Sequence, residues 1–207
     1  MGSFELIEKL LSFNLFKNKI NNDDIMQICN ILSSSEYNMN NKYCAILILD
    51  SLPYEVLKYL VKFPKFINDI IKINNVDFIG KFLYKICTFP EGSETLICQP
   101  KFLEENIENP RILSLFILLC SFYPKETLRF AFLFKNIIKF NKERKYIETI
   151  LRIIGTLSSY TNFQENPEII DELIQLLKES YCNEMELTLL IGIFYNISNS
   201  QNDNVYP

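Results

Sequence analysis

The chain of 207 residues contains no histidine and no tryptophan, and it has only 5 glycines and 8 prolines. Without histidine it cannot form a Ser-His-Asp triad, a Cys-His pair or a histidine zinc site, and it lacks the most common general base. It also has no glycine-rich phosphate loop and no motif of the H-E-x-x-H or G-x-S-x-G type. We therefore expect a protein that is not an enzyme and that holds neither a metal nor another cofactor.

The six cysteines do not form a recognisable site, because no two of them have the C-x-x-C spacing. That spacing marks zinc sites and redox motifs, so we expect neither a metal site nor a disulfide framework. Most of the cysteines lie in apolar runs, and we expect them to be buried in a reducing compartment. Cys182, between two helical segments, is expected to be the most exposed. An enzymatic alternative would depend on a reactive cysteine.

The sequence also lacks a long apolar run. Residues 112–123 form the longest one, which Ser114 and Ser121 interrupt, and it is too short to span a bilayer. The first residues carry no basic segment of the kind that begins a signal peptide. We therefore expect a cytoplasmic protein that does not bind a membrane.

Basic charge is not in excess, since 21 Lys and Arg oppose 25 Asp and Glu for a net charge of -4. A nucleic-acid binder gains much of its affinity by neutralising phosphates, so this balance argues against that class. The chain is 48% hydrophobic, which argues against disorder and provides for one core or a short solenoid.

Apolar residues recur with the period of an α-helix throughout the chain. They fall at i, i+3, i+4 and i+7 in one segment after another, and no segment alternates with the period of a strand. The Asn-Pro pairs at Asn109-Pro110 and Asn166-Pro167 each provide an N-cap followed by proline in the first turn. The pattern predicts an all-α fold. Examples of the spacing are Ile25, Ile28, Cys29 and Leu32, then Ile79, Phe82, Leu83 and Ile86, and then Ile147, Ile150, Leu151 and Ile154.

The predicted helices also repeat along the chain. Similar segments place corresponding residues 37, 33, 37 and 37 positions apart. A helix that cannot bury its apolar face alone buries it by stacking on a neighbouring copy, which produces a solenoid. The corresponding residues are Ser51, Thr88, Ser121, Ser158 and Tyr195.

At this point the sequence resembles the armadillo and related HEAT repeats. The best match is the segment 172–180 followed by 185–198, with 146–160 as the last helix of the preceding unit. The resemblance implies a right-handed α-solenoid of about five armadillo-like repeats, whose last helix in each unit lines a concave surface that holds other proteins. It implies a single domain over 1–207, with an irregular N-terminal cap in 1–39 and repeats in 40–207, the last of them truncated.

The sequence departs from the armadillo proteins that clamp peptides with a ladder of Trp-x-x-x-Asn motifs. There is no tryptophan, and only Asn196 falls on the asparagine position of the ladder. We therefore do not expect capture of a nuclear-localisation segment in the manner of importin-α.

A basic segment precedes an acidic one near the C-terminal end. Lys135, Lys139 and Lys142 lie at i, i+4 and i+7, so one helix face carries all three, whereas acidic residues dominate from Glu165 onward. One interpretation is a docking patch for a charged protein partner. The other is a solvated outer face on which adjacent repeats pair their charges.

The resemblance also places five polar residues on the helices that would line the concave surface. They would hydrogen-bond the main chain of a bound partner, although surface solubility explains them equally well. They are Lys81, Lys85, Arg152, Thr156 and Asn196.

These observations favour a non-catalytic scaffold that binds a protein partner along an extended surface. One alternative is a regulatory or oligomerisation segment of a larger protein, attached for example to a signalling or kinase-type domain, whose apolar helix at 187–197 stacks on another copy. A helical-repeat RNA binder would instead need the basic residues of 125–152 to contact phosphate. The adjacent carboxylates Glu104 and Glu105 do not face each other on a helix and cannot act as an acid/base pair.

The all-α prediction has a direct test. Because no segment has the period of a strand, the circular dichroism spectrum of the purified protein should be strongly helical. A substantial β-sheet signal would contradict the predicted fold.

Overall fold

The computed structural model describes residues 22–140, 146–160, 166–178 and 182–200. Every regular element in these ranges is a helix and none is a strand, so the prediction of an all-α fold is confirmed for this part of the chain. The chain divides into two compact units, Met1–Cys98 and Gln99–Pro207. Residues 1–21, which belong to the expected N-terminal cap, lie outside the described ranges.

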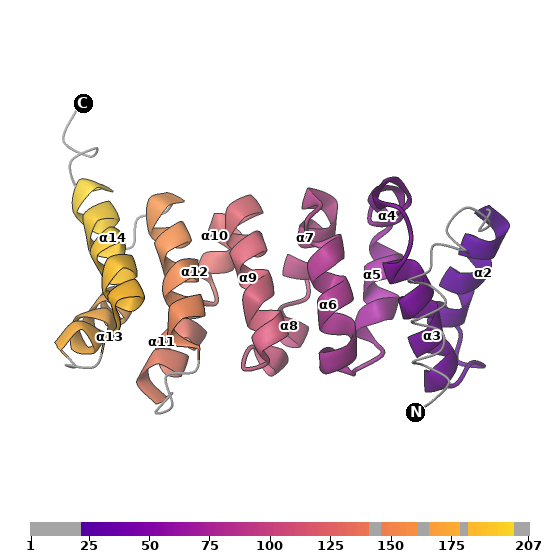
Figure 1. The fold of residues 1–207 in the computed structure, drawn as a ribbon, viewed down its shortest axis with the longest axis horizontal. Helices are drawn as coiled ribbons and strands as arrows, with labels where there is room; N and C mark the ends of the chain where they lie inside the picture. Colours follow the sequence, from indigo (N-terminus) through magenta and orange to yellow (C-terminus); the bar gives the residue numbers. More distant parts are fainter. Residues whose placement is uncertain (1–21, 141–145, 161–165, 179–181, 201–207) are drawn as a thin grey trace. The chain divides into compact units, whose positions relative to one another are not determined.

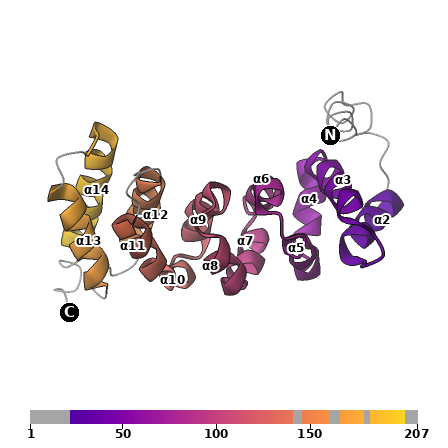
Figure 2. The same ribbon diagram turned by 90° about the horizontal axis from the view of Figure 1, so that it is seen from below.

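The first unit arranges its helices in two layers (Figures 1 and 2). Helices α3 and α6 pack against each other in one layer, and α2, α5 and α7 follow one another in the second layer. Helix α2 also packs on α3 and so joins the two layers. The helices are α2 (Asn22–Ser33), α3 (Met39–Asp50), α4 (Tyr54–Leu60), α5 (Pro64–Ile71), α6 (Val76–Ile86) and α7 (Pro90–Ile97).

The second unit is built in the same way. Helices α9, α12 and α14 form one row, with α12 between the other two, and α11 packs on α13 in a second row. Helix α11 also contacts α12, and the short α10 packs against both α9 and α12. The helices are α8 (Pro100–Asn106), α9 (Pro110–Phe122), α10 (Pro124–Leu128), α11 (Ala131–Phe140), α12 (Ile147–Tyr160), α13 (Pro167–Lys178) and α14 (Glu184–Ser200).

Apolar residues predicted from the helical period fill the space between the layers. In the second unit Phe116 of α9 meets Phe130 and Phe134, with both pairs of ring centroids 5.2 Å apart and the rings in edge-to-face geometry. Such contacts stabilise a core beyond the area that the rings bury. In the first unit Ile79 and Phe82 of α6 are fully buried.

Local sequence signals explain where several helices begin. The side chain of Asn109 accepts a hydrogen bond from the backbone N–H of Arg111, as the Asn-Pro pair predicted. Helix α14 begins with a capping box, in which the Asn183 side chain accepts from the N–H of Glu186 and the Glu186 carboxylate accepts from the N–H of Asn183. Because the Glu186 carboxylate accepts the hydrogen bond from the N–H of Asn183, the Glu186 side chain can be buried at the start of α14.

Within each unit, neighbouring helices of one row meet through residues that are about one predicted repeat apart. The ring of Tyr43 in α3 packs at a tilt against Phe78 with ring centroids 4.6 Å apart, and the Tyr43 hydroxyl accepts a hydrogen bond from Asn75, 32 positions away. In the second unit Asn196 of α14 donates to Ser159 of α12, 37 positions away. The spacing of these contacts is close to the spacing of the corresponding segments in the sequence.

Gly92 marks the closest approach between two helices of the first unit. A Cβ atom at this position would lie 2.1 Å from the backbone oxygen of Ile86, the last residue of α6. The next residue, Ser93, donates its hydroxyl hydrogen to the backbone oxygen of Cys87 at 2.8 Å. The start of α7 therefore packs directly on the end of α6, and only glycine allows this contact.

Two of the helical glycines, Gly92 and Gly192, should respond to alanine in opposite directions. Gly92→Ala forces α6 and α7 apart, and we expect it to lower the free energy of unfolding by about 1–3 kcal/mol. At Gly192 a Cβ atom would meet nothing within 4 Å, so Gly192→Ala should raise that free energy by up to about 1 kcal/mol. Chemical denaturation of both variants measures the difference, and an unchanged or higher stability of Gly92→Ala would contradict the close packing.

Candidate partner-binding surfaces

Two of the predicted basic residues connect α11 to α13. The ammonium group of Lys135 forms an ion pair with Glu168, and Lys139 Nζ lies 3.8 Å from Glu172 Oε1. The partners in each pair are 33 positions apart in the sequence. The hydrogen bond from Lys135 and then its positive charge lower the pKa of the Glu168 carboxyl. The charges of adjacent helices are therefore paired, as the second interpretation of the basic segment expected.

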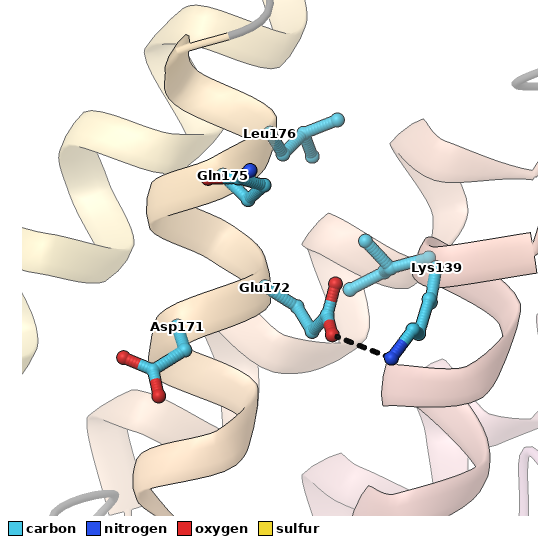
Figure 3. A pocket seen from close by; sticks show the side chains of 6 residues that line it. Lys139, Asp171, Glu172, Gln175 and Leu176 are labelled. Atoms are coloured by element: carbon cyan, nitrogen blue, oxygen red, sulfur yellow. Dashed lines mark ion pairs between the residues drawn. The ribbon is translucent and has the colours of Figure 1, made fainter.

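A cleft of about 460 Å³ lies between these two helices. Figure 3 shows the Glu172 carboxylate pointing toward Lys139, while Asp171 points away from it. Ile138 and Leu176 complete the lining together with Gln175. Lys139 and Glu172 both line the cleft, so a charged ligand there would compete with their ion pair. Lys142, the third residue of the predicted basic face, lies outside the described residues.

The two predicted lysines of the first unit share one carboxylate. Lys81 and Lys85 lie on α6, and their ammonium groups are 3.3 and 3.4 Å from the two carboxylate oxygens of Asp50. Lys85 also donates to the backbone oxygen of Asp50, the last residue of α3. A cation at this place satisfies a terminal carbonyl and interacts favourably with the negative end of the helix dipole. Both lysines therefore contribute to the stacking of α6 on α3.

The remaining predicted residues lie together on α12 and α14. Arg152 donates from Nε and Nη2 to Glu148 Oε1 at 3.1 and 2.8 Å, and its Nη2 lies 3.9 Å from the sulfur of Met185 on α14. One turn further along α12, the Thr156 hydroxyl donates to the backbone oxygen of Arg152. Asn196 reaches from α14 to α12, as described above. We call Arg152, Thr156, Ser159, Met185 and Asn196 the α12–α14 stripe.

The α12–α14 stripe differs from the lysine pairs in its chemistry. The hydroxyls of Thr156 and Ser159 donate to backbone oxygens four positions earlier in their own helix. The Ser159 oxygen also accepts the hydrogen bond from Asn196 and keeps one lone pair, and the Thr156 oxygen can likewise accept a further hydrogen bond. Arg152 is a donor with a half-exposed side chain. The stripe thus presents both donors and acceptors on a surface shared by two helices.

Two further hollows were not predicted from the sequence. One, of about 660 Å³, lies between α8 and α11 and combines the carboxylates of Glu104, Glu105 and Glu108 with apolar residues such as Leu133 and Ile137. Periodicity along one helix could not find it, because Glu104 and Glu105 belong to α8 whereas Glu108 lies in the turn that follows that helix. The other, of about 430 Å³, is lined mainly by apolar residues of α2, α4 and α5. It was not predicted because it combines three helices, each of which supplies only a few residues.

The buried cysteines are unsuited to nucleophilic chemistry. Burial raises the pKa of the Cys87 thiol to about 12, against the smaller opposite effect of its hydrogen bond with Ser93. Burial also raises the pKa of Cys120. A thiol attacks as the thiolate, and these two remain protonated near neutral pH.

The expectation that Cys182 is the most exposed cysteine is wrong. The exposed cysteine is Cys98, at the C-terminal end of α7, whereas Cys182 is half-buried. The reason is that the Cys182 thiol reaches back to the backbone oxygen of Leu176 on α13, 3.2 Å away. Such a contact between a loop and the preceding helix has no signal in the sequence.

Comparisons with protein-family models, with curated proteins and with solved structures found no match for this chain. Within the described ranges, no three His, Cys, Asp or Glu side chains come together in a group that could hold a metal ion. No helix in those ranges combines the length and the apolar character that crossing a membrane requires.

The pair formed by Lys139 and Glu172 should couple α11 to α13. A double-mutant cycle with Lys139→Ala and Glu172→Ala should give a coupling free energy of about 0.2–1 kcal/mol, because the pair is partly exposed. The swap Lys139→Glu with Glu172→Lys should recover stability that Lys139→Glu alone loses. The cycle is measured by chemical denaturation, and zero coupling would show that Lys139 does not contribute to stacking.

Proposed function

We propose that the chain is an α-solenoid of armadillo-like repeats and acts as a non-catalytic scaffold that binds a protein partner. The observation that carries this proposal is the stacking within each unit, where helices of one row meet through residues about one repeat apart. Proteins built from stacked repeats present long surfaces of regularly spaced side chains, and these surfaces suit extended partners. The six cysteines, all in the described residues, form no disulfide, which supports a cytoplasmic location.

We place the partner on the α12–α14 stripe. The lysines at 81, 85, 135 and 139 are engaged in ion pairs that join neighbouring helices, so binding through them would cost stacking energy. The stripe instead offers the acceptor oxygens of Thr156 and Ser159 beside the guanidinium group of Arg152. An extended peptide needs donors and acceptors of this kind for its own main chain.

The same ion pairs weigh against the RNA-binding alternative. Lys135 and Lys139 are paired with carboxylates of α13. Contact with a phosphate would bring a second negative group to each of these cations or require the carboxylate to leave. A protein partner does not need to neutralise the cation and fits the mixed polar stripe better.

Removal of the Arg152 charge tests the proposed surface. Arg152→Gln should lower the affinity for the partner captured from a lysate of the source organism at least about tenfold, because central arginines often dominate an interface. Lys101→Gln is the matched control, since Lys101 is also exposed and also pairs with a glutamate four positions away, but on α8. Affinity is compared by quantitative pull-down and mass spectrometry. Equal capture by the wild type and both variants would contradict the α12–α14 stripe as the binding surface.

A further inference from the structure

The hollow between α2, α4 and α5 has a buried carboxylate in its lining. Asp69 of α5 is 5% exposed, whereas aspartate is rarely buried unless it is paired. The hollow has a volume of about 430 Å³, which is in the range of pockets that hold small molecules. Its apolar side chains include Met26, Leu32, Phe63 and Phe66. An apolar pocket of this size with a charged group in its lining is typical of a binding site. We call it the Asp69 hollow.

One of the two carboxylate oxygens of Asp69 has no partner among the described residues. Lys72 Nζ donates to the other oxygen, Oδ1, at 3.0 Å, and the Lys72 side chain is 73% exposed. This cation therefore reaches the carboxylate from the solvent side and leaves Oδ2 unpaired. A buried carboxylate oxygen without a hydrogen bond is costly, and such groups are rare in folded proteins. A ligand that donates a hydrogen bond to Oδ2 would remove this cost.

The negative charge of Asp69 acts inside the hollow. Cys29 of α2 also lines it, and burial followed by the charge of Asp69 raises the pKa of the Cys29 thiol. A negative neighbour has this effect because it disfavours the thiolate. Lys65 lines the hollow as well, but it is exposed, so water screens its charge more than the charge of the buried Asp69. The hollow therefore favours a positive group over a negative one.

Aromatic rings make up much of the remaining lining. Tyr59 and Phe63 contact each other edge-to-face with ring centroids 5.3 Å apart. They are 61 and 48% exposed, so they lie where the hollow meets the solvent. Phe66 is buried and packs edge-to-face on Phe82 of α6, which holds its ring in place. Aromatic rings of this kind contact both apolar groups and cations favourably.

We infer that the Asp69 hollow binds a small organic cation, whose protonated amine donates to Asp69 Oδ2 and whose apolar body lies against Met26, Tyr59 and Phe63. A hydrogen bond between two charged groups is stronger than one between neutral groups, and the apolar surroundings strengthen it further. The inference goes beyond the proposed scaffold function and does not depend on it, because the hollow belongs to the first unit and the α12–α14 stripe to the second.

Three probes with the same apolar chain and different head groups test which charge the hollow selects. Near neutral pH octylammonium is positive, octanol is neutral and octanoate is negative. Titration calorimetry on the full chain should give octylammonium an affinity at least about tenfold above that of octanol, with octanoate the weakest. Octanol that binds as tightly as octylammonium would overturn the inference, and so would octanoate that binds best, since Lys65 would then decide the affinity. Absence of binding would also overturn it, and is the result expected if another part of the chain or a different protein fills the hollow.

Replacement of Asp69 tests whether the carboxylate makes the selection. Asp69→Asn keeps the size of the side chain and removes its charge, so it should lower the affinity for octylammonium at least about tenfold and change the affinity for octanol less than about twofold. Asp23→Asn is the matched control, because Asp23 of α2 is exposed and does not line the hollow. An equal loss for both probes would show that Asp69 serves only the fold, and this result would overturn the inference.

A second variant locates the probes without a change at the buried carboxylate. Tyr59→Ala removes an exposed ring from the hollow and should weaken octylammonium and octanol alike, because both probes share the apolar chain. Tyr84→Ala on α6 is its control, since Tyr84 is 41% exposed and does not line the hollow. Unchanged binding by Tyr59→Ala would place the probes elsewhere and overturn the inference. Failure of Arg152→Gln to reduce partner capture would affect only the proposed scaffold function.

Discussion

Stacking of one helix pair on the next buries the apolar side of each helix, and the other features of the two units follow from this contact. A single amphipathic helix cannot remove its apolar side from water, so each helix depends on its neighbours in the row and in the opposite layer. The fully buried rings of Phe116 in α9, Phe134 in α11 and Phe130 in the turn before α11 show how tightly α9 and α11 meet. At Gly92 the approach of α7 to α6 leaves no space for a Cβ atom.

Polar residues reinforce the stacking instead of standing apart from it. Asp50 receives two lysines from the neighbouring helix, and Glu168 and Glu172 each receive one. Each partly exposed ion pair contributes little energy. Because the pairs form only when neighbouring helices are aligned in one register, they favour that register over others. Residues that look like a binding patch in the sequence can therefore serve the fold first. A partner surface is better sought where polar groups keep unused hydrogen-bonding capacity, as on the α12–α14 stripe.

Corresponding places of α12 and α14 differ in how far they are buried. Helix α14 covers α12, while the corresponding side of α14, with Leu187, Ile191 and Tyr195, is exposed. The two helices are not identical in sequence. At the place that corresponds to the buried Ser158 of α12, α14 carries Tyr195, 37 positions later. The small side chain of Ser158 suits the tight contact between α12 and α14, where it accepts a hydrogen bond from Asn196.

The sequence by itself determined the helical class, the positions of capped helix starts such as Asn109, and the approximate period of the contacts, because these depend on local spacing. It also identified the basic and acidic segments, but it could not decide between a docking patch and paired charges. Only the tertiary structure decided that Lys139 meets Glu172, that Cys98 is exposed while Cys182 is half-buried, and that Glu104, Glu105 and Glu108 line a hollow with α11. The physical reason is that these properties depend on which helices come side by side, and periodicity along one helix does not specify its neighbour.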